Sequence, residues 1–326
     1  MKIALVYAVL LALLLAAGAL ALAVGQGDLA DPTLRRTLLE LRATRVAAAL
    51  LAGAALAVGG VVVQGVFRNP LVSPSILGTT AGASLGGQLA LLALAWGAAG
   101  RAVPTELVLP IGCLLGAACS LAILLFFCRE RAGTLVLILT GFILSSLFLA
   151  IGGFVTSLAQ DQWDLGRAVV AFTLGGVGGT GLRQVAAAAP LVLIGLGACW
   201  AWSGTLDVLI SGEDEARTLG VEVGQARRWT VIWVAVLTSA AIAVGGNVAF
   251  VGLVVPHALR PIVGVGHRRL IPAAALLGAV FLVVCDVIAR VFPSRAELPL
   301  GVITGLLGAP LFLYLLARYY REVEHG

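Results

Sequence analysis

One short stretch of this chain, from Asp207 to Arg228, is unusually rich in charged residues. It holds eight charged side chains in 22 positions, whereas only 11% of the 326 residues are charged. Acids in the first turn of a helix are favoured by the helix dipole, and residues 213–215 read Glu-Asp-Glu. A plain connection between two helices needs only a few polar residues. The stretch is therefore typical of a docking element, with an ordinary solvated loop as the alternative.

The spacing within this stretch predicts two short helices joined at a glycine corner. Ser211 can cap a helix that begins near Gly212, and Gly220 is suited to end it. A second short helix is expected over 221–228, leading into the next apolar segment. Ala216 and Leu219 would then form an apolar knob surrounded by acids. The residues expected to make the docking contact are Glu213, Asp214, Glu215, Ala216, Arg217, Leu219 and Gly220.

The residue types present argue against ATP binding, proton relay and metal binding by this chain. Lys2 is its only lysine, so the G-x-x-x-x-G-K-[ST] phosphate-binding loop cannot form. Asp286 lies four residues before Arg290, which predicts an ion pair on one helix face rather than a proton relay. The three histidines are not grouped and no C-x-x-C occurs. These patterns predict no metal site, no catalytic residues, no bound cofactor and no nucleic-acid partner.

The elements that carry these residues are apolar and long. The chain is 60% hydrophobic with a mean hydropathy of +1.07, too little charge for a water-exposed skin. A helix needs about 20 apolar residues to cross the hydrocarbon of a bilayer. Ten such segments are predicted, so the expected fold is an all-α membrane protein. They are 3–24, 46–67, 75–97, 105–127, 134–158, 184–203, 229–246, 248–266, 270–291 and 298–317.

Two segments depart from this simple count. Trp163–Gly181 begins amphipathic and becomes glycine-rich, which favours a short interfacial or re-entrant helix. Residues 28–45 are polar and compatible with a helix. We expect a single transmembrane domain over 1–326 and an uncleaved first span. Ten spans place both termini on one side, and a small excess of basic residues predicts that this side is cytoplasmic.

Six blocks of sequence, spread in order along nearly the whole chain, resemble one family. The chain is similar to the FecCD-type permease subunits of type II ABC importers for iron-siderophore, haem and vitamin B12. The blocks are 41–45 (LRATR), 64–71 (QGVFRNPL), 77–84 (LGTTAGAS), 212–220 (GEDEARTLG), 246–257 (GNVAFVGLVVPH) and 296–310 (AELPLGVITG, continuing to GAP). One departure is 72–75 (VSPS), where relatives often carry an acid beside the proline.

The resemblance implies a set of partners in the bacterial inner membrane. It implies ten helices in each of two permease copies, expected to be a homodimer, with the translocation path between them. Two cytoplasmic ATPase subunits would bind ATP and Mg²⁺ and receive the charged stretch as coupling helices. A periplasmic binding protein would dock on the other side, and Arg42, Arg45 and Arg290 would meet its acidic residues through bidentate pairs. Snorkelling to lipid headgroups is the alternative for these arginines.

The resemblance also implies a gate and a path. The cytoplasmic gate corresponds to Asn69 and Leu71 and to Gly133 and Thr134. The fifth span is expected to line the path. Its candidate lining residues are Ser145, Ser146, Thr156 and Ser157.

The sequence as a whole predicts a transport subunit without enzymatic activity. Its expected cargo is an iron chelate, ferric siderophore or haem, with cobalamin as the alternative. An ion-coupled secondary transporter would need titratable groups in mid-membrane, which are nearly absent. An intramembrane enzyme would need a nucleophile and a base close together, and the sequence gives no sign of such a pair.

Overall fold

The chain is a bundle of long helices lying side by side. The computed structural model describes residues 2–25, 27, 30–97, 103–127, 134–292 and 297–324, and within them every regular element is a helix. The long helices are α1 (Lys2–Ala23), α2 (Pro32–Phe67), α3 (Thr79–Ala95), α4 (Thr105–Phe127), α5 (Thr134–Ala159), α7 (Leu182–Ala201), α10 (Val223–Gly245), α11 (Val251–Val263), α12 (His267–Val291) and α13 (Leu300–Glu324). The short ones are η1 (Pro74–Leu77), α6 (Trp163–Leu174), α8 (Ser203–Ser211) and α9 (Glu213–Thr218).

Each predicted span corresponds to one long helix, which confirms the all-α membrane fold. Among the described residues, seven helices are long and apolar enough to cross a membrane, and three shorter apolar helices complete the set. The predicted break between the seventh and eighth spans is also confirmed. α10 ends at Gly245, and Gly246 follows with a φ of 64°, a left-handed conformation that glycine adopts at little cost.

The polar segment before the second span is part of the same helix. α2 runs without interruption for 36 residues, because Asp31 caps its first turn and no glycine or proline interrupts the junction near Arg45. The Asp31 carboxylate accepts hydrogen bonds from the backbone N–H and the hydroxyl of Thr33, at 2.8 and 2.6 Å. Both bonds favour the charged carboxylate, so they hold the pKa of Asp31 below its usual value.

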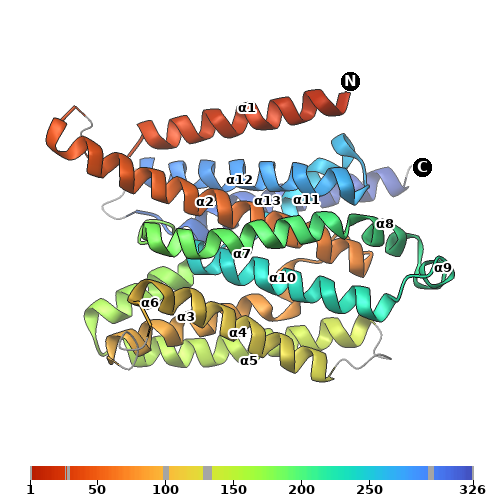
Figure 1. The fold of residues 1–326 in the computed structure, drawn as a ribbon, viewed down its shortest axis with the longest axis horizontal. Helices are drawn as coiled ribbons and strands as arrows, with labels where there is room; N and C mark the ends of the chain where they lie inside the picture. Colours follow the sequence, from red (N-terminus) through yellow and green to blue (C-terminus); the bar gives the residue numbers. More distant parts are fainter. Residues whose placement is uncertain are drawn as a thin grey trace.

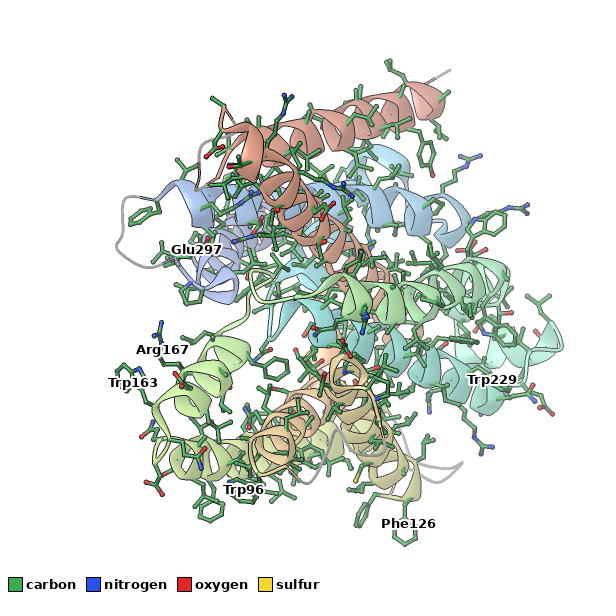
Figure 2. The ribbon with its side chains drawn as sticks, turned by 60° about the vertical axis from the view of Figure 1, so that its left-hand side comes forward. Trp96, Phe126, Trp163, Arg167, Trp229 and Glu297 are labelled. Atoms are coloured by element: carbon green, nitrogen blue, oxygen red, sulfur yellow. The ribbon has the colours of Figure 1, made fainter. Side chains whose placement is uncertain are left out.

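The bundle has two distinct ends. Both termini lie at the end that carries α8 and α9, whereas α6 and the connection from α1 to α2 lie at the opposite end (Figure 1). Exposed aromatic side chains mark both ends: Trp163 begins α6, and Trp229 lies in the first turns of α10, which follows α9 (Figure 2). Tryptophan is enriched where hydrocarbon meets headgroups, so this spacing fits a multi-pass protein that crosses a bilayer along its long axis.

Glycine contacts bring the central helices close together. A Cβ added to Gly60 of α2 would overlap the carbonyl oxygen of Gly252 in α11, and one on Gly53 would overlap that of Gly278 in α12. Such contacts let helix backbones approach and gain van der Waals attraction, which drives helix association in lipid. α2 therefore lies in the centre of the molecule, against α7, α10, α11 and α12.

The glycine-rich segment after α6 is not helical, and its neighbours supply most of its hydrogen bonds. The Gly176 N–H donates to the Gly245 carbonyl, and the Leu300 N–H donates to the Gly175 carbonyl, both at 2.9 Å. The Thr180 hydroxyl donates to the Val244 carbonyl at 2.7 Å. Irregular backbone at membrane depth is tolerated only when protein or water satisfies it. The segment thus joins α6 to the break after α10 and to the start of α13.

Candidate functional site

The charged stretch forms a compact projection at one end of the bundle. α8 ends at Ser211, Gly212 follows with a φ of 137°, and the six-residue α9 begins directly after it. The prediction that Ser211 caps this helix is wrong, because residues 203–211 form a helix of their own and Ser211 is its last residue. The predicted end is confirmed: Gly220 follows α9 with a φ of 82°.

The exposed apolar surface of this projection is smaller than predicted. Leu219 has 68% of its surface exposed, whereas Ala216 is fully buried. The expectation of a two-residue knob is therefore wrong, because the chain folds back after α9. The Val221 N–H donates to the Ala216 carbonyl at 2.9 Å and covers that side of the helix. Asp214 and Arg217 are exposed and form a loose ion pair, 3.7 Å apart.

The second predicted short helix does not exist as a separate element. Residues 223–228 are the first turns of α10, which continues without a break to Gly245. Gly224 does not interrupt it, since glycine inside a helix costs only about 1 kcal/mol. The projection therefore consists of α8 and α9, with α10 leading directly back into the bundle.

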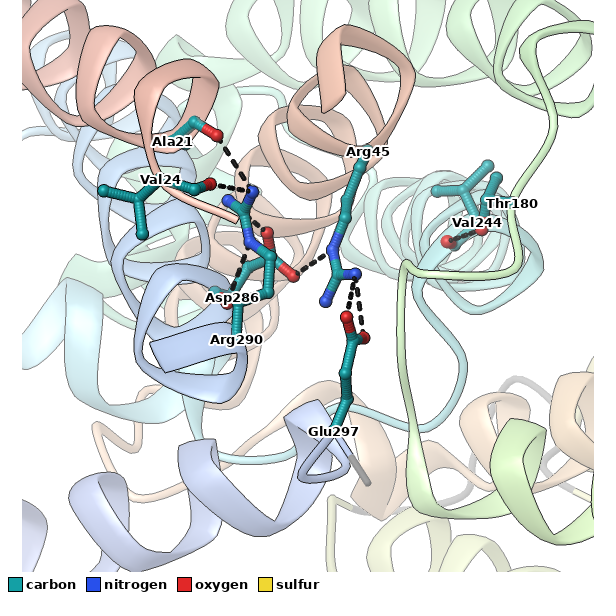
Figure 3. Close-up of polar contacts among 8 residues, drawn as sticks. All are labelled: Ala21, Val24, Arg45, Thr180, Val244, Asp286, Arg290 and Glu297. Atoms are coloured by element: carbon teal, nitrogen blue, oxygen red, sulfur yellow. Dashed lines mark hydrogen bonds and ion pairs between the residues drawn. The ribbon is translucent and has the colours of Figure 1, made fainter. Parts of the chain in front are cut away.

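Three arginines at the opposite end lie inside the protein. Arg45 Nε is 2.7 Å from Asp286 Oδ1, and Arg290 Nη2 is 2.9 Å from Asp286 Oδ2 (Figure 3). Arg290 Nη1 also donates to the carbonyls of Ala21 and Val24. The predicted pair of Asp286 and Arg290 is thus confirmed as an ion pair. Arg45, from α2, completes a buried group of two cations around one carboxylate.

Glu297 and Arg42 extend this network. Arg45 Nη1 donates to both carboxylate oxygens of Glu297, at 3.0 and 2.8 Å, and the Glu297 side chain is 37% exposed (Figure 3). Arg42 is buried and donates to the carbonyls of Leu22, Ala23, Gly25 and Gly27. Together with the ion pairs of Asp286, these bonds hold α1, α2 and α12 in contact.

The network gives Arg42, Arg45 and Arg290 partners within their own chain, and their contact with acids of a binding protein stays a prediction. The three guanidinium groups are covered and engaged by carboxylates and carbonyls of their own chain. The sequence could not reveal this for Arg45, because its two acids lie 241 and 252 positions away.

Two of the predicted gate residues, Asn69 and Leu71, lie just after the end of α2. Arg68 terminates the helix in a left-handed conformation with a φ of 49°, and the Asn69 Oδ1 accepts a hydrogen bond from the Leu71 N–H at 2.9 Å. This turn is at the same end as α9 (Figure 1). Gly133 lies outside the described residues. Thr134 is the first residue of α5.

Two of the predicted lining residues border a polar groove. Thr156 and Ser157 of α5, together with Gln88 of α3 and Thr173 of α6, line a cavity of about 330 Å³. Gln88 Nε2 donates to the Thr173 hydroxyl at 3.0 Å. Ser145 and Ser146 do not line it, and their hydroxyls donate to carbonyls one helical turn earlier. Sequence reasoning missed Gln88, since one glutamine in an apolar span carries no positional signal.

α5 also carries an apolar face that the rest of the chain leaves exposed. Side chains along that face are large, apolar and exposed, including Phe142, Ile143, Leu147 and Phe154. The groove itself offers hydroxyl and amide groups without charge. Among the residues the structure describes, no group of three histidine, cysteine or acidic side chains is placed to hold a metal ion.

Another contact missed by sequence reasoning lies at the end that carries α9. Asp207 of α8 accepts hydrogen bonds from the backbone N–H of His267, at 2.8 Å, and lies 2.8 Å from its ring Nδ1. The sequence placed Asp207 in the charged stretch and left His267 ungrouped. Sixty positions separate the two residues, so only the fold brings them together.

Comparison with known proteins agrees with this arrangement. The Fe(3+) dicitrate transport permease FecD of Escherichia coli is 39% identical over 86% of this chain and 85% of its own length. The cobalamin import permease BtuC of Halobacterium salinarum is 36% identical over 85% and 72%. The hemin transport permease HmuU of Yersinia pestis is 36% identical over 88% and 85%.

A solved structure has the same fold along the whole chain. It is described as an inward-facing conformation of a metal-chelate type ABC transporter. The two are 31% identical, superpose with a TM-score of 0.85, and match over 96% of this chain and 99% of that one. Residues 4–318 match the family described as the FecCD transport family. The chain therefore belongs to the FecCD transport family, a family of ABC importer permeases.

Proposed function

We propose that this chain is the permease subunit of an ATP-driven importer for an iron chelate, either a ferric siderophore or haem. FecD and HmuU, two relatives of high identity, are permeases for ferric dicitrate and hemin. Cobalamin is the second candidate cargo, because the permease BtuC is similar to the same degree as HmuU. The chain itself performs no covalent chemistry and holds no cofactor.

The observation that carries this proposal is the α8–α9 projection in a chain that has no phosphate-binding loop. Lys2 is the only lysine, so ATP bound through such a loop must be on another protein, together with its Mg²⁺. α9 offers that protein an exposed leucine, Leu219, between exposed charges. Two ATPase subunits docked on α9 of two permease copies supply the energy. This end and both termini are then cytoplasmic.

The translocation path in this proposal lies between two copies of the chain. α5 carries both an exposed apolar face and residues that line the groove. A second copy covers this face and closes the groove into a path. Neutral hydroxyl and amide groups suit a path, because a strongly binding site would retain cargo that must leave. The ends of α2 and α5, at Asn69 and Thr134, form the cytoplasmic gate.

A periplasmic binding protein delivers the cargo at the end that carries α6. Arg42, Arg45 and Arg290 hold α1, α2 and α12 in a fixed arrangement and so shape the surface on which the binding protein sits.

The test is an uptake assay in proteoliposomes of inner-membrane lipid. The permease is reconstituted with its ATPase and binding protein, and uptake of labelled haem, a ferric siderophore and cobalamin is compared with and without ATP. We expect ATP-dependent accumulation of an iron chelate. Accumulation of cobalamin alone would assign the second cargo. Accumulation by the permease alone, driven by an ion gradient, would contradict the proposal.

A further inference from the structure

Asp207 connects the docking projection to the beginning of α12. α12 has Gly266 at its N-cap position, and glycine offers no side chain to accept the first free N–H groups of the helix. The Asp207 carboxylate takes this place from a different helix, by accepting the backbone N–H of His267. The same oxygen faces the His267 ring at 2.8 Å. α8, which continues into α9 through Gly212, is thus hydrogen-bonded to the first residue of α12.

The first turns of α12 are held from three further helices. Pro272 has no N–H, so the Arg268 carbonyl four residues earlier loses its helical partner. The indole N–H of Trp200, in α7, donates to that carbonyl at 3.2 Å. The Tyr7 hydroxyl, in α1, donates to the next carbonyl, of Arg269, at 2.7 Å. On the inner side, the His267 ring lies against Gly65 of α2, where a Cβ would overlap the ring.

The other end of α12 is fixed by the ion-pair network. Asp286 and Arg290 lie in its last turns and are joined to Arg45 of α2 (Figure 3). Between the two ends α12 is an uninterrupted helix of 25 residues, about 37 Å long. Figure 1 shows it running along the bundle from the end that carries α8 to the opposite end. A displacement applied at His267 therefore reaches the network without passing through a loop.

We propose that Asp207 and His267 form a positioning pair that transmits the movement of the docking projection to α12. The proposal rests on the proposed function, in which an ATPase moves α9. Without this pair, α8 would be held by apolar contacts such as those of the buried Leu206 and Leu209, and such contacts have no fixed direction. The hydrogen bonds between Asp207 and His267 have a fixed direction, so α8 and the first turn of α12 move together. α12 then carries the movement to Arg45 and the cargo-entry end.

The experiment compares Asp207→Ala, which removes the acceptor, with Asp207→Asn, which keeps an oxygen for the His267 N–H. Each permease is assembled with its ATPase and binding protein in proteoliposomes. The measured quantity is the number of cargo molecules taken up per ATP hydrolysed. We expect this ratio to fall on the order of fivefold or more in D207A, the low end of typical coupling between sites. D207N should restore most of it, and co-purification of the ATPase should be unchanged in both.

Tyr7→Phe is the matched control, since it also removes one side-chain hydrogen bond to the first turns of α12 but from a helix that has no link to α9. It should leave the ratio unchanged. If Y7F lowers the ratio as D207A does, the effect is general loosening of α12 and the proposal is overturned. A D207A protein with the wild-type ratio overturns it as well.

His267→Ala provides an independent measurement if D207A does not fold. It removes only the ring contact and leaves the backbone N–H of residue 267 bonded to Asp207, so it should lower the ratio by less than D207A does. Where D207A folds, the D207A/H267A double variant should be no worse than D207A alone, because D207A already removes both contacts. Additive losses, or a wild-type ratio in H267A, would overturn the proposal. A wild-type complex that takes up no cargo with ATP contradicts the proposed function instead, so the two failures are distinguishable.

Discussion

At the scale of single residues, the buried group around Asp286 has the largest energetic consequences. Two guanidinium groups approach one carboxylate whose side chain is 1% exposed. Taking charges out of water is costly, and their mutual attraction offsets that cost only while all partners are present. Glu297, in contrast, is partly exposed and binds Arg45 from the outer side. The two carboxylates should therefore respond differently to substitution.

We predict that Asp286→Asn destabilises the protein by roughly 3–5 kcal/mol, the usual cost of removing one partner from a buried ion pair. Glu297→Gln should cost much less, because Arg45 keeps Asp286 and water reaches the site. Thermal unfolding of the two purified variants in the same detergent measures the difference. Equal losses in D286N and E297Q would contradict the assignment of Asp286 as the centre of the network.

At the scale of elements, glycine positions decide how closely the helices pack. α2 approaches α11 at Gly60 and α12 at Gly53, where any side chain would meet a carbonyl oxygen. In contrast, a Cβ on Gly18 of α1 would have no neighbour within 4 Å. The same substitution should therefore have opposite effects at two positions that look alike in the sequence, each a glycine within an apolar span.

We predict that Gly60→Ala destabilises the bundle by about 1–3 kcal/mol, the range found when a packed core is overfilled. Gly18→Ala should be neutral or slightly stabilising, since alanine favours a helix over glycine. Unfolding in detergent, followed by tryptophan fluorescence, measures both. A G60A protein as stable as G18A would show that α2 and α11 are not in backbone contact.

The elements that could be predicted from the sequence are those encoded by neighbouring residues. Apolar runs predict the spans, and the spacing of Asp286 and Arg290 predicts their pairing. The predictions that failed, and the contacts that sequence reasoning missed, concern residues whose surroundings depend on other parts of the chain. Ser211 ends a helix because the eight residues before it are also helical. Ala216 is covered because Val221 returns to it, and Arg45 is internal because distant segments supply Asp286 and Glu297.

At the scale of the whole molecule, the two ends of the bundle have different partners in the proposed importer. Leu219, directly after α9, and Leu182, the first residue of α7, each have 68% of their surface exposed, and α9 and the start of α7 lie at opposite ends (Figure 1). Docking of the ATPase should depend on one and not on the other. This comparison separates a specific contact from the general effect of placing a charge on an exposed leucine.

We predict that Leu219→Glu reduces co-purification of the ATPase with the permease by tenfold or more, about 1.4 kcal/mol of binding free energy. Leu182→Glu should leave co-purification unchanged. Both variants should elute as the wild-type protein in size-exclusion chromatography. Full ATPase recovery with L219E would exclude Leu219 from the interface.

The length of α2 has a further consequence for any soluble partner that delivers cargo. A helix of 36 residues is about 54 Å long, whereas the hydrocarbon of a bilayer is about 30 Å thick. Even with the average tilt of about 20°, roughly 20 Å of α2 must extend beyond the hydrocarbon. Its first turns, which carry Arg35, Arg36 and Glu40, act as a rigid spacer above the lipid headgroups. A partner that reaches the mouth of the path needs a recess to accommodate them.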